Sequence, residues 1–211
     1  MKNMKLSNKT ILVYRICVAA LTWFTLISGW AISAIESGIP LIWLNGFRYY
    51  TTQTNIMVSV WLVLAIIWYK KPEALKRIQG PLKGAFTLFI TTTFVFFAIL
   101  LQRLYFPTGF AAFANIMLHY LIPIAFIIDW ILTETEIRYK WKYLAYWTMY
   151  PIGYLMFSFI HGSFTGDYIY PFLNVDQIGI IGYIIILSFL IGVGLVIGSL
   201  YIGINRKRTN S

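Results

Sequence analysis

The sequence predicts an all-α integral membrane protein: a bundle of six transmembrane helices with both termini in the cytoplasm. Three observations predict this fold class. Of the 211 residues, 59% are hydrophobic and only 11% are charged, whereas soluble domains are about 45–50% apolar and about 25% charged. The mean hydropathy is +0.73. Six apolar stretches alternate with short polar segments, and 15 of the 17 basic residues fall on one side of that alternation.

Each of the six stretches is long enough to cross the hydrocarbon core, which takes about 17–25 mostly apolar residues. Backbone polar groups must bond to one another inside lipid, so each stretch is predicted to be a helix. The predicted spans are residues 11–35, 51–69, 84–101, 112–132, 143–161 and 178–203, followed by a basic cytoplasmic tail at 204–211. The first stretch is longer than the apolar region of a signal peptide, about 7–15 residues, so we expect it to remain as a span. Because every loop is short, residues 1–211 are predicted to form one membrane domain.

The basic residues orient this bundle. Those on the predicted inner side are Lys2, Lys5, Lys9, Arg15, Lys70, Lys71, Lys76, Arg77, Lys83, Arg138, Lys140, Lys142, Arg206, Lys207 and Arg208. Only Arg48 and Arg103 fall on the outer side. Cytoplasmic loops of membrane proteins carry the excess of Lys and Arg, so both termini are placed inside. We expect the basic loops to face anionic lipid headgroups rather than nucleic acid. Asp129, near the inner end of the fourth span, is expected to be an interface or salt-bridge residue.

The cysteine count and composition exclude other classes. A single cysteine, Cys17, excludes a disulfide scaffold and a cysteine-rich metal site. The apolar composition excludes a disordered chain, a coiled coil and an ordinary soluble enzyme. Trp and Tyr residues, Tyr170 among them, gather at the span ends as an aromatic belt does.

Polar side chains of three predicted spans gather at one depth. Thr52 and Asn55 lie near the start of the second span, Asn115 and His119 near the start of the fourth, and His161 at the end of the fifth. From the helical rise, Thr52 and Asn55 lie about 3–8 Å below the outer end, and Asn115 and His119 about 5–10 Å below it. Residues three or four apart share a helix face. The sequence therefore predicts one polar site in the outer third of the membrane.

These residue types suggest an ester hydrolase. A threonine hydroxyl is a weak nucleophile at neutral pH and needs an adjacent base. The two histidines are the only side chains of this chain that serve as bases near neutral pH without a large shift in pKa. We expect Thr52 to be the nucleophile and His119 the base. Asn55, Asn115 and His161 would support them by orienting the base, stabilising an oxyanion or positioning water.

The two outer arginines are candidates to hold a substrate carboxylate. Arg48 and Arg103 flank the predicted site, and a guanidinium pairs well with a carboxylate. The alternative is that both side chains extend to lipid headgroups. No cofactor is expected, and no metal, because two histidines without a carboxylate at their depth fall short of a three-ligand catalytic set.

Each candidate also has a purely structural interpretation. A threonine in a membrane helix usually bonds the carbonyl one turn back, and we expect this of residues 91–93, a run of three threonines. Inward-facing asparagines commonly bridge helices. Pro123 and Pro151 are expected to kink their helices. Gly194 and Gly198 form a small-residue pair that permits close helix packing, within the chain or in a homo-oligomer.

Three segments carry a resemblance to a known family. They are residues 50–55 (YTTQTN), 115–123 (NIMLHYLIP) and 170–173 (YPFL). In this order they resemble the androgen-induced-protein family of six-span membrane proteins and its bacterial relatives. The likeness follows nearly the whole chain in span order.

The resemblance implies an intramembrane threonine hydrolase. The animal members cleave fatty acid esters of hydroxy fatty acids with a threonine–histidine pair. Thr52 matches the threonine because Asn55 falls three positions later, where the family has an acidic or amide residue; Thr51 is a near alternative. His119 matches the histidine, although it precedes Pro123 by four residues where the family has five.

Two classes of function follow. The first is a hydrolase of long-chain fatty acyl esters near the outer leaflet of a bacterial cytoplasmic membrane, with membrane lipids as its partners. The second is a non-enzymatic membrane protein that binds or transports a lipid or small amphiphile. Transport is less supported, because no polar residues continue from Asn55 or His119 to the inner face.

Overall fold

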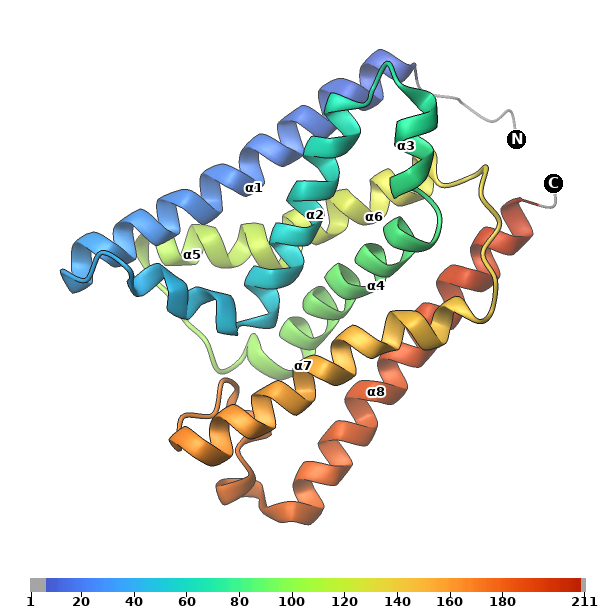
Figure 1. The fold of residues 1–211 in the computed structure, drawn as a ribbon. Coiled ribbons are helices and arrows are strands. Elements are labelled where there is room, and N and C mark those ends of the chain that lie inside the picture. The colour runs from blue at the N-terminus through green and yellow to red at the C-terminus, as the bar shows by residue number, and fades with distance from the viewer. Residues whose placement is uncertain (1–6, 210–211) are drawn as a thin grey trace.

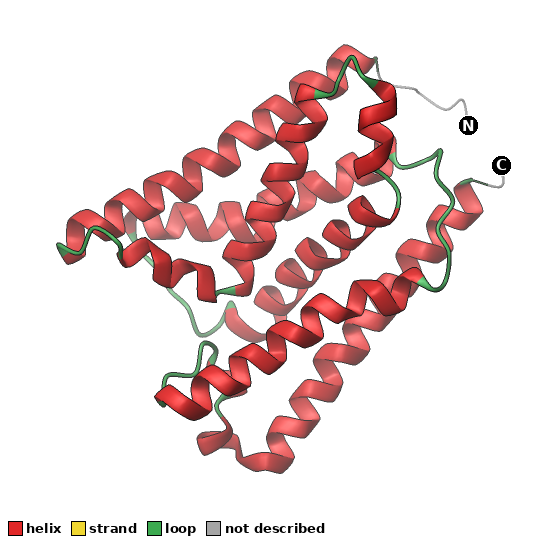
Figure 2. Ribbon diagram, viewed as in Figure 1, coloured by secondary structure: helices red, strands yellow, loops and turns green. Residues whose placement is uncertain are grey.

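The computed structural model describes residues 7–209, and these residues are almost entirely helical, with no strand among them (Figure 2). The predicted inner-side residues Lys2 and Lys5 lie outside the described part. The α-helices are α1 (Asn8–Ser37), α2 (Tyr50–Ile67), α3 (Pro72–Ile78), α4 (Pro81–Phe96), α5 (Gly109–Ile116), α6 (Ile122–Thr133), α7 (Tyr143–Thr165) and α8 (Val175–Arg208). Two 3₁₀ turns, η1 (Ile42–Arg48) and η4 (Pro171–Leu173), and two π-helical turns, η2 (Phe97–Leu101) and η3 (Met117–Leu121), complete the list.

Five helical segments of the described residues are long and apolar enough to cross a membrane. They are α1, α2, α4 with η2 (Pro81–Leu101), the continuous segment α5–η3–α6 (Gly109–Thr133), and α8. They coincide with five of the six predicted spans. Helix α7 has 23 residues, but it falls short in hydropathy and is not among the five. Helix α8 continues to Arg208, so the first residues of the predicted basic tail are its last turn.

Helix α4 lies at the centre of the bundle, in contact with α2, α6, α7 and α8. Helix α1 packs along α2, and α7 runs beside α8 (Figure 1). The connections lie at two ends (Figure 2). The start of α1, helix α3, the α6–α7 connection and the end of α8 share one end, and η1, the 102–108 loop and the 166–174 loop share the other (Figure 1).

Local sequence explains where the helices begin and end. Ser7 caps α1 by accepting a hydrogen bond from the Thr10 backbone N–H, and Asn174 caps α8 in the same way. Gly166 ends α7 with φ of 72°, a left-handed conformation that glycine adopts without strain. Pro123 lies two residues after the end of the π turn η3, so the helix irregularity expected near this proline precedes it.

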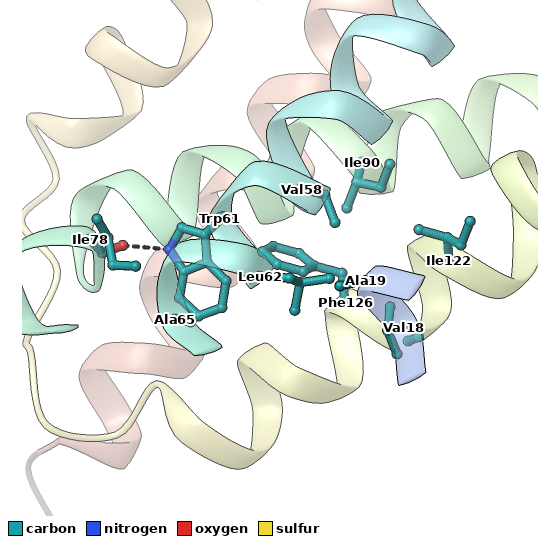
Figure 3. Close-up of a cluster of buried hydrophobic side chains, with 11 residues drawn as sticks. Val18, Ala19, Val58, Trp61, Leu62, Ala65, Ile78, Ile90, Ile122 and Phe126 are labelled. Carbon is teal, nitrogen blue, oxygen red and sulfur yellow. Dashed lines mark hydrogen bonds between the residues drawn. The ribbon is translucent and has the colours of Figure 1, made fainter. Parts of the chain in front are cut away.

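The apolar core is built around Trp61 of α2. Its indole Nε1 donates to the Ile78 carbonyl at 2.7 Å and thereby ties α3 to α2 (Figure 3). The buried side chains packed in this cluster come from α1, α2, α3, α4 and α6: Val18, Ala19, Val58, Trp61, Leu62, Ala65, Ile78, Ile90, Ile122, Ala125 and Phe126. Helix α6 is thus held against α1 and α2 by ordinary hydrophobic burial.

Gly198 provides a close approach within the chain. A Cβ atom at Gly198 would lie 2.6 Å from Leu144 and 3.4 Å from Leu88, whereas one at Gly194 would meet nothing within 4 Å. The close packing predicted for this pair is therefore used at Gly198 to bring α8 against α4 and α7. Self-association through the pair stays a prediction.

The three threonines at 91–93 make the predicted local hydrogen bonds. Each hydroxyl donates to a backbone carbonyl three or four residues back. Each also contacts a hydroxyl of another helix: Thr91 contacts Tyr201, Thr92 contacts Tyr50 and Thr93 contacts Thr54.

A buried ion cluster joins α1, α4 and α6. Asp129 accepts from Arg15 Nε at 2.8 Å and from Lys83 Nζ at 3.0 Å, and the three residues are 1%, 4% and 0% exposed. Both cations also lie over the Trp61 ring, at 5.0 and 4.5 Å from its centroid. The salt-bridge interpretation of Asp129 is confirmed. Arg15 and Lys83, counted among the inner-side charges, do not face lipid headgroups as the basic loops were expected to, because this carboxylate holds both inside the bundle.

Glu134 borders the cluster just beyond the end of α6. It is 1% exposed, and its Oε1 accepts from the Gly80 N–H at 2.8 Å. Burial raises the pKa of Glu134 from its ordinary 4.5 to about 7, although the nearby Lys83 opposes that rise. The charges that face this carboxyl are those of Lys83, Asp129 and Arg15.

We expect Asp129→Asn to destabilise the protein severely. The variant leaves two buried cations without their counter-ion, and breaking a buried pair costs about 3–5 kcal/mol. Thermal unfolding in detergent measures the loss. Glu73→Gln is the control, because Glu73 pairs with Lys76 at the surface, where both side chains are well exposed. Equal melting temperatures for Asp129→Asn and the wild type would contradict a structural role for the cluster.

We expect stability to fall with rising pH because of Glu134. The folded state holds this proton more tightly than the unfolded chain, so the contribution is complete below about pH 4.5 and is lost as the pH rises through about 7. The shift corresponds to about 3 kcal/mol. Glu134→Gln should therefore flatten the melting-temperature profile between about pH 5 and pH 8. The exposed Glu136→Gln should keep the wild-type profile; identical profiles for all three proteins would refute the assignment.

Candidate functional site

A threonine–histidine pair joins the start of α2 to η3. Thr51 Oγ1 lies 3.1 Å from His119 Nε2, and His119 Nδ1 lies 3.1 Å from the Asn115 carbonyl oxygen. Because a carbonyl can only accept, Nδ1 carries the proton and Nε2 presents its lone pair. The Thr51 hydroxyl therefore donates to His119. This is the arrangement of a hydroxyl nucleophile with an oriented base.

The threonine bonded to His119 is Thr51 and not Thr52. Successive residues of a helix point about 100° apart, so only one of the two neighbours can face the histidine. Thr52 is half-buried and makes no hydrogen bond to His119. The expected pairing of Thr52 with His119 is thus replaced by its near alternative, one residue earlier.

Asn55 braces the pair from within α2. It is fully buried, and its Nδ2 donates to the Thr51 carbonyl at 2.8 Å and to the Leu118 carbonyl at 3.1 Å. One amide thus binds both the residue that bears the hydroxyl and the residue before His119. Asn115 contributes its backbone carbonyl. Among the described residues, the buried Oδ1 atoms of Asn55 and Asn115 have no hydrogen-bond partner, so each retains an acceptor near the pair.

Phe97 packs against the face of the histidine ring. The rings of Phe97 and His119 are stacked, with centroids 3.8 Å apart and an interplanar angle of 18°. Phe97 opens the π turn η2, and His119 lies within the π turn η3. Such turns occur frequently at functional sites. Here the two irregular turns meet at the candidate base.

Two of the remaining predicted site residues, His161 and Arg48, meet at Asp167. His161 Nδ1 donates to the Asp167 carbonyl at 2.9 Å, and the Asp167 carboxylate forms an ion pair with Arg48. Arg103 is exposed in the loop after η2. Neither His161 nor Arg48 nor Arg103 has a hydrogen bond to Thr51 or His119 among the described residues. These three residues therefore lie outside the hydrogen bonds of the Thr51–His119 pair, although they were predicted to belong to the same site.

Thr51 also lines a cavity between α4, α7 and α8. The cavity measures about 80 Å³, and most of its wall is apolar. Tyr154 and Tyr170 stand with Thr51 at its polar end, where both tyrosine hydroxyls accept from the Tyr50 N–H, at 3.1 and 3.2 Å. Burial raises the pKa of Tyr170 above its ordinary value of 10.0, so its hydroxyl stays protonated at neutral pH. The hydroxyl-bearing member of the pair, Thr51, thus lines an apolar chamber, whereas His119 lies behind it and does not line the cavity.

Phe97, Tyr154 and Tyr170 are neighbours of the site that were not predicted from the sequence as functional residues. Tyr170 was assigned to the aromatic belt, although it begins the YPFL segment that carried the family resemblance. That segment was the available signal for Tyr170. Phe97 and Tyr154 have no comparable signal, because apolar spans rich in aromatic residues contain many equivalent positions.

No protein-family model, no curated protein and no solved structure matches the chain. The class of site is therefore defined by its geometry. It is a hydroxyl hydrogen-bonded to a histidine of fixed tautomer, in the wall of an apolar cavity within a helical bundle.

Proposed function

We propose that this protein is an intramembrane hydrolase of long-chain fatty acyl esters, with Thr51 as nucleophile and His119 as base. The observation that carries the proposal is the 3.1 Å contact between Thr51 Oγ1 and His119 Nε2. The hydrogen bond from Nδ1 to the Asn115 carbonyl keeps Nε2 free to accept the threonine proton.

The reaction proceeds in two halves. Thr51 Oγ1 attacks the ester carbonyl as His119 takes its proton, and the tetrahedral intermediate expels the alcohol, which leaves with that proton. Water then attacks the acyl-threonine with His119 again as base, and the fatty acid is released. The first N–H groups of a helix have no acceptor within it. In α2 the Tyr50 N–H is taken by the hydroxyls of Tyr154 and Tyr170, so the oxyanion would draw on the N–H groups of the residues that follow Tyr50. The free Oδ1 atoms of Asn55 and Asn115 offer acceptors to the attacking water.

The membrane setting completes the proposal. We place α7 as the sixth span and both termini in the cytoplasm of a bacterial cell, because the basic residues that remain outside the ion cluster still concentrate at the end where α1 begins. The start of α2 belongs to the opposite end (Figure 1). Thr51 and His119 would then face the outer leaflet, where an ester can enter from lipid.

The family resemblance supports the same chemistry. Relatives of the androgen-induced-protein type would use a threonine at a helix start and a histidine ahead of a proline, and Thr51 and His119 occupy such positions. The cavity favours one second candidate, a protein that binds a lipid chain without cleaving it. Absence of turnover with retained binding would assign that function.

Hydrolysis of 4-nitrophenyl palmitate by purified protein tests the proposal. Thr51→Ala and His119→Ala should each lower kcat by about 10³-fold or more, because the nucleophile and its base act as a unit. Thr52→Ala is the matched control and should stay within a few-fold of the wild type. A fluorophosphonate should label Thr51 in the wild type and in Thr52→Ala. Full activity of Thr51→Ala would refute the mechanism, and an inactive wild type would refute the hydrolase assignment.

Cysteine accessibility tests the placement of α7. In a Cys17→Ala background, single cysteines replace Lys140, exposed in the α6–α7 connection, and Phe164, 87% exposed in the last turn of α7. A membrane-impermeant maleimide should label Phe164→Cys in intact cells and Lys140→Cys only after permeabilisation. Labelling of both from the same side would contradict a sixth span.

A further inference from the structure

We propose that the cavity between α4, α7 and α8 is a hydrocarbon-chain site, and that the substrate is a neutral ester with no free acid on the chain held there. This inference rests on the proposed function and specifies its substrate. We call this space the chain cavity. It is the cavity of about 80 Å³ whose wall includes Thr51, Leu88, Leu155, Leu190 and Gly194.

The chain cavity has one polar end and a mostly apolar wall. The polar end holds the hydroxyls of Thr51, Tyr154 and Tyr170 at the start of α2. Leucine, isoleucine and phenylalanine side chains supply most of the remainder. An ester whose carbonyl lies at Thr51 can therefore extend its chain over apolar surface, where burial is favourable. The volume exceeds the roughly 10–15 Å³ that a cavity needs to hold one water, and the apolar wall suits a hydrocarbon chain better than a charged headgroup.

Charge argues against an acid in this space. The residues that line the chain cavity, all within the described part of the chain, include no Lys, Arg, His, Asp or Glu. A carboxylate buried there would lack a counter-ion, which is costly.

The two candidate arginines, Arg48 and Arg103, are placed elsewhere, and so are the buried cations Arg15 and Lys83. Arg48 is paired with Asp167, and Arg15 and Lys83 are paired with Asp129. Arg103 is exposed in the loop after η2. The expectation that Arg48 or Arg103 holds a substrate carboxylate is therefore replaced by a site for an uncharged chain.

Gly194 leaves the wall of the chain cavity open. A Cβ atom there would meet nothing within 4 Å, so a larger side chain can enter the space without a backbone clash. Gly192, two residues earlier on α8, is equally open but does not line the cavity. The two glycines form a matched pair, of which only Gly194 should influence the length of chain that fits.

The test compares Gly194→Leu with Gly192→Leu on 4-nitrophenyl esters of increasing chain length. Gly194→Leu should lower kcat/KM for the palmitate about tenfold or more relative to the butyrate, and Gly192→Leu should keep the wild-type ratio. A palmitate analogue with a carboxylate at the far end of its chain should be cleaved about 100-fold more slowly than the palmitate itself. An unchanged chain-length ratio in Gly194→Leu, or equal cleavage of the carboxylated analogue, would overturn the inference while leaving the hydrolase proposal intact.

A binding measurement separates the two proposals. A non-hydrolysable hexadecyl ether with a diazirine in its chain should photolabel residues of α7 and α8 that line the cavity, in Thr51→Ala and in the wild type alike. Labelling there by a protein that shows no turnover would support the chain site and refute the hydrolase. Labelling confined to other helices would overturn the chain site. This test does not depend on the folding of Gly194→Leu.

Discussion

The ion cluster at Asp129 is the constraint on which the rest of the bundle depends. A carboxylate between apolar helices is tolerable only when it is paired, and here it is paired twice, with Arg15 of α1 and Lys83 of α4. These contacts set the rotation of α6 about its axis. The same segment continues back through η3 to His119, about three turns away. The histidine's direction is therefore coupled to a salt bridge at the opposite end of the helix.

Helix α4 connects the two ends of the molecule. Lys83 lies in its first turn and belongs to the ion cluster, and Phe97 follows its last turn and stacks on His119. Between them, the threonines at 91–93 satisfy their hydroxyls within α4 and against neighbouring helices. The hydroxyl of Thr51, on α2, instead contacts the ring of His119. The threonines in this part of the bundle thus divide into the structural ones of α4 and the candidate catalytic one of α2.

Much of this architecture could be predicted from the sequence, because length and hydropathy determine where a chain can cross a membrane. The site could be predicted only to within a residue. Thr51 and Thr52 are chemically identical, and the phase of α2, which the structure decides, separates them. Arg15 and Lys83 resemble loop charges in sequence, because only the tertiary pairing with Asp129 reveals their burial. The π turns that bring Phe97 onto His119 leave no mark in the hydropathy pattern.

The end of the bundle that holds η1 and the 166–174 loop shows how charge is kept away from the candidate site. Arg48 lies only three residues before Thr51, yet its guanidinium pairs with Asp167, whose carbonyl in turn accepts from His161. These contacts occupy the groups that most resembled a carboxylate-binding site in the sequence. What remains around Thr51 is uncharged: hydroxyls, amide oxygens, a histidine whose Nδ1 proton is bound to Asn115, and apolar side chains. Such surroundings favour a neutral acyl ester over an acid, since only the ester enters without losing the solvation of a charge.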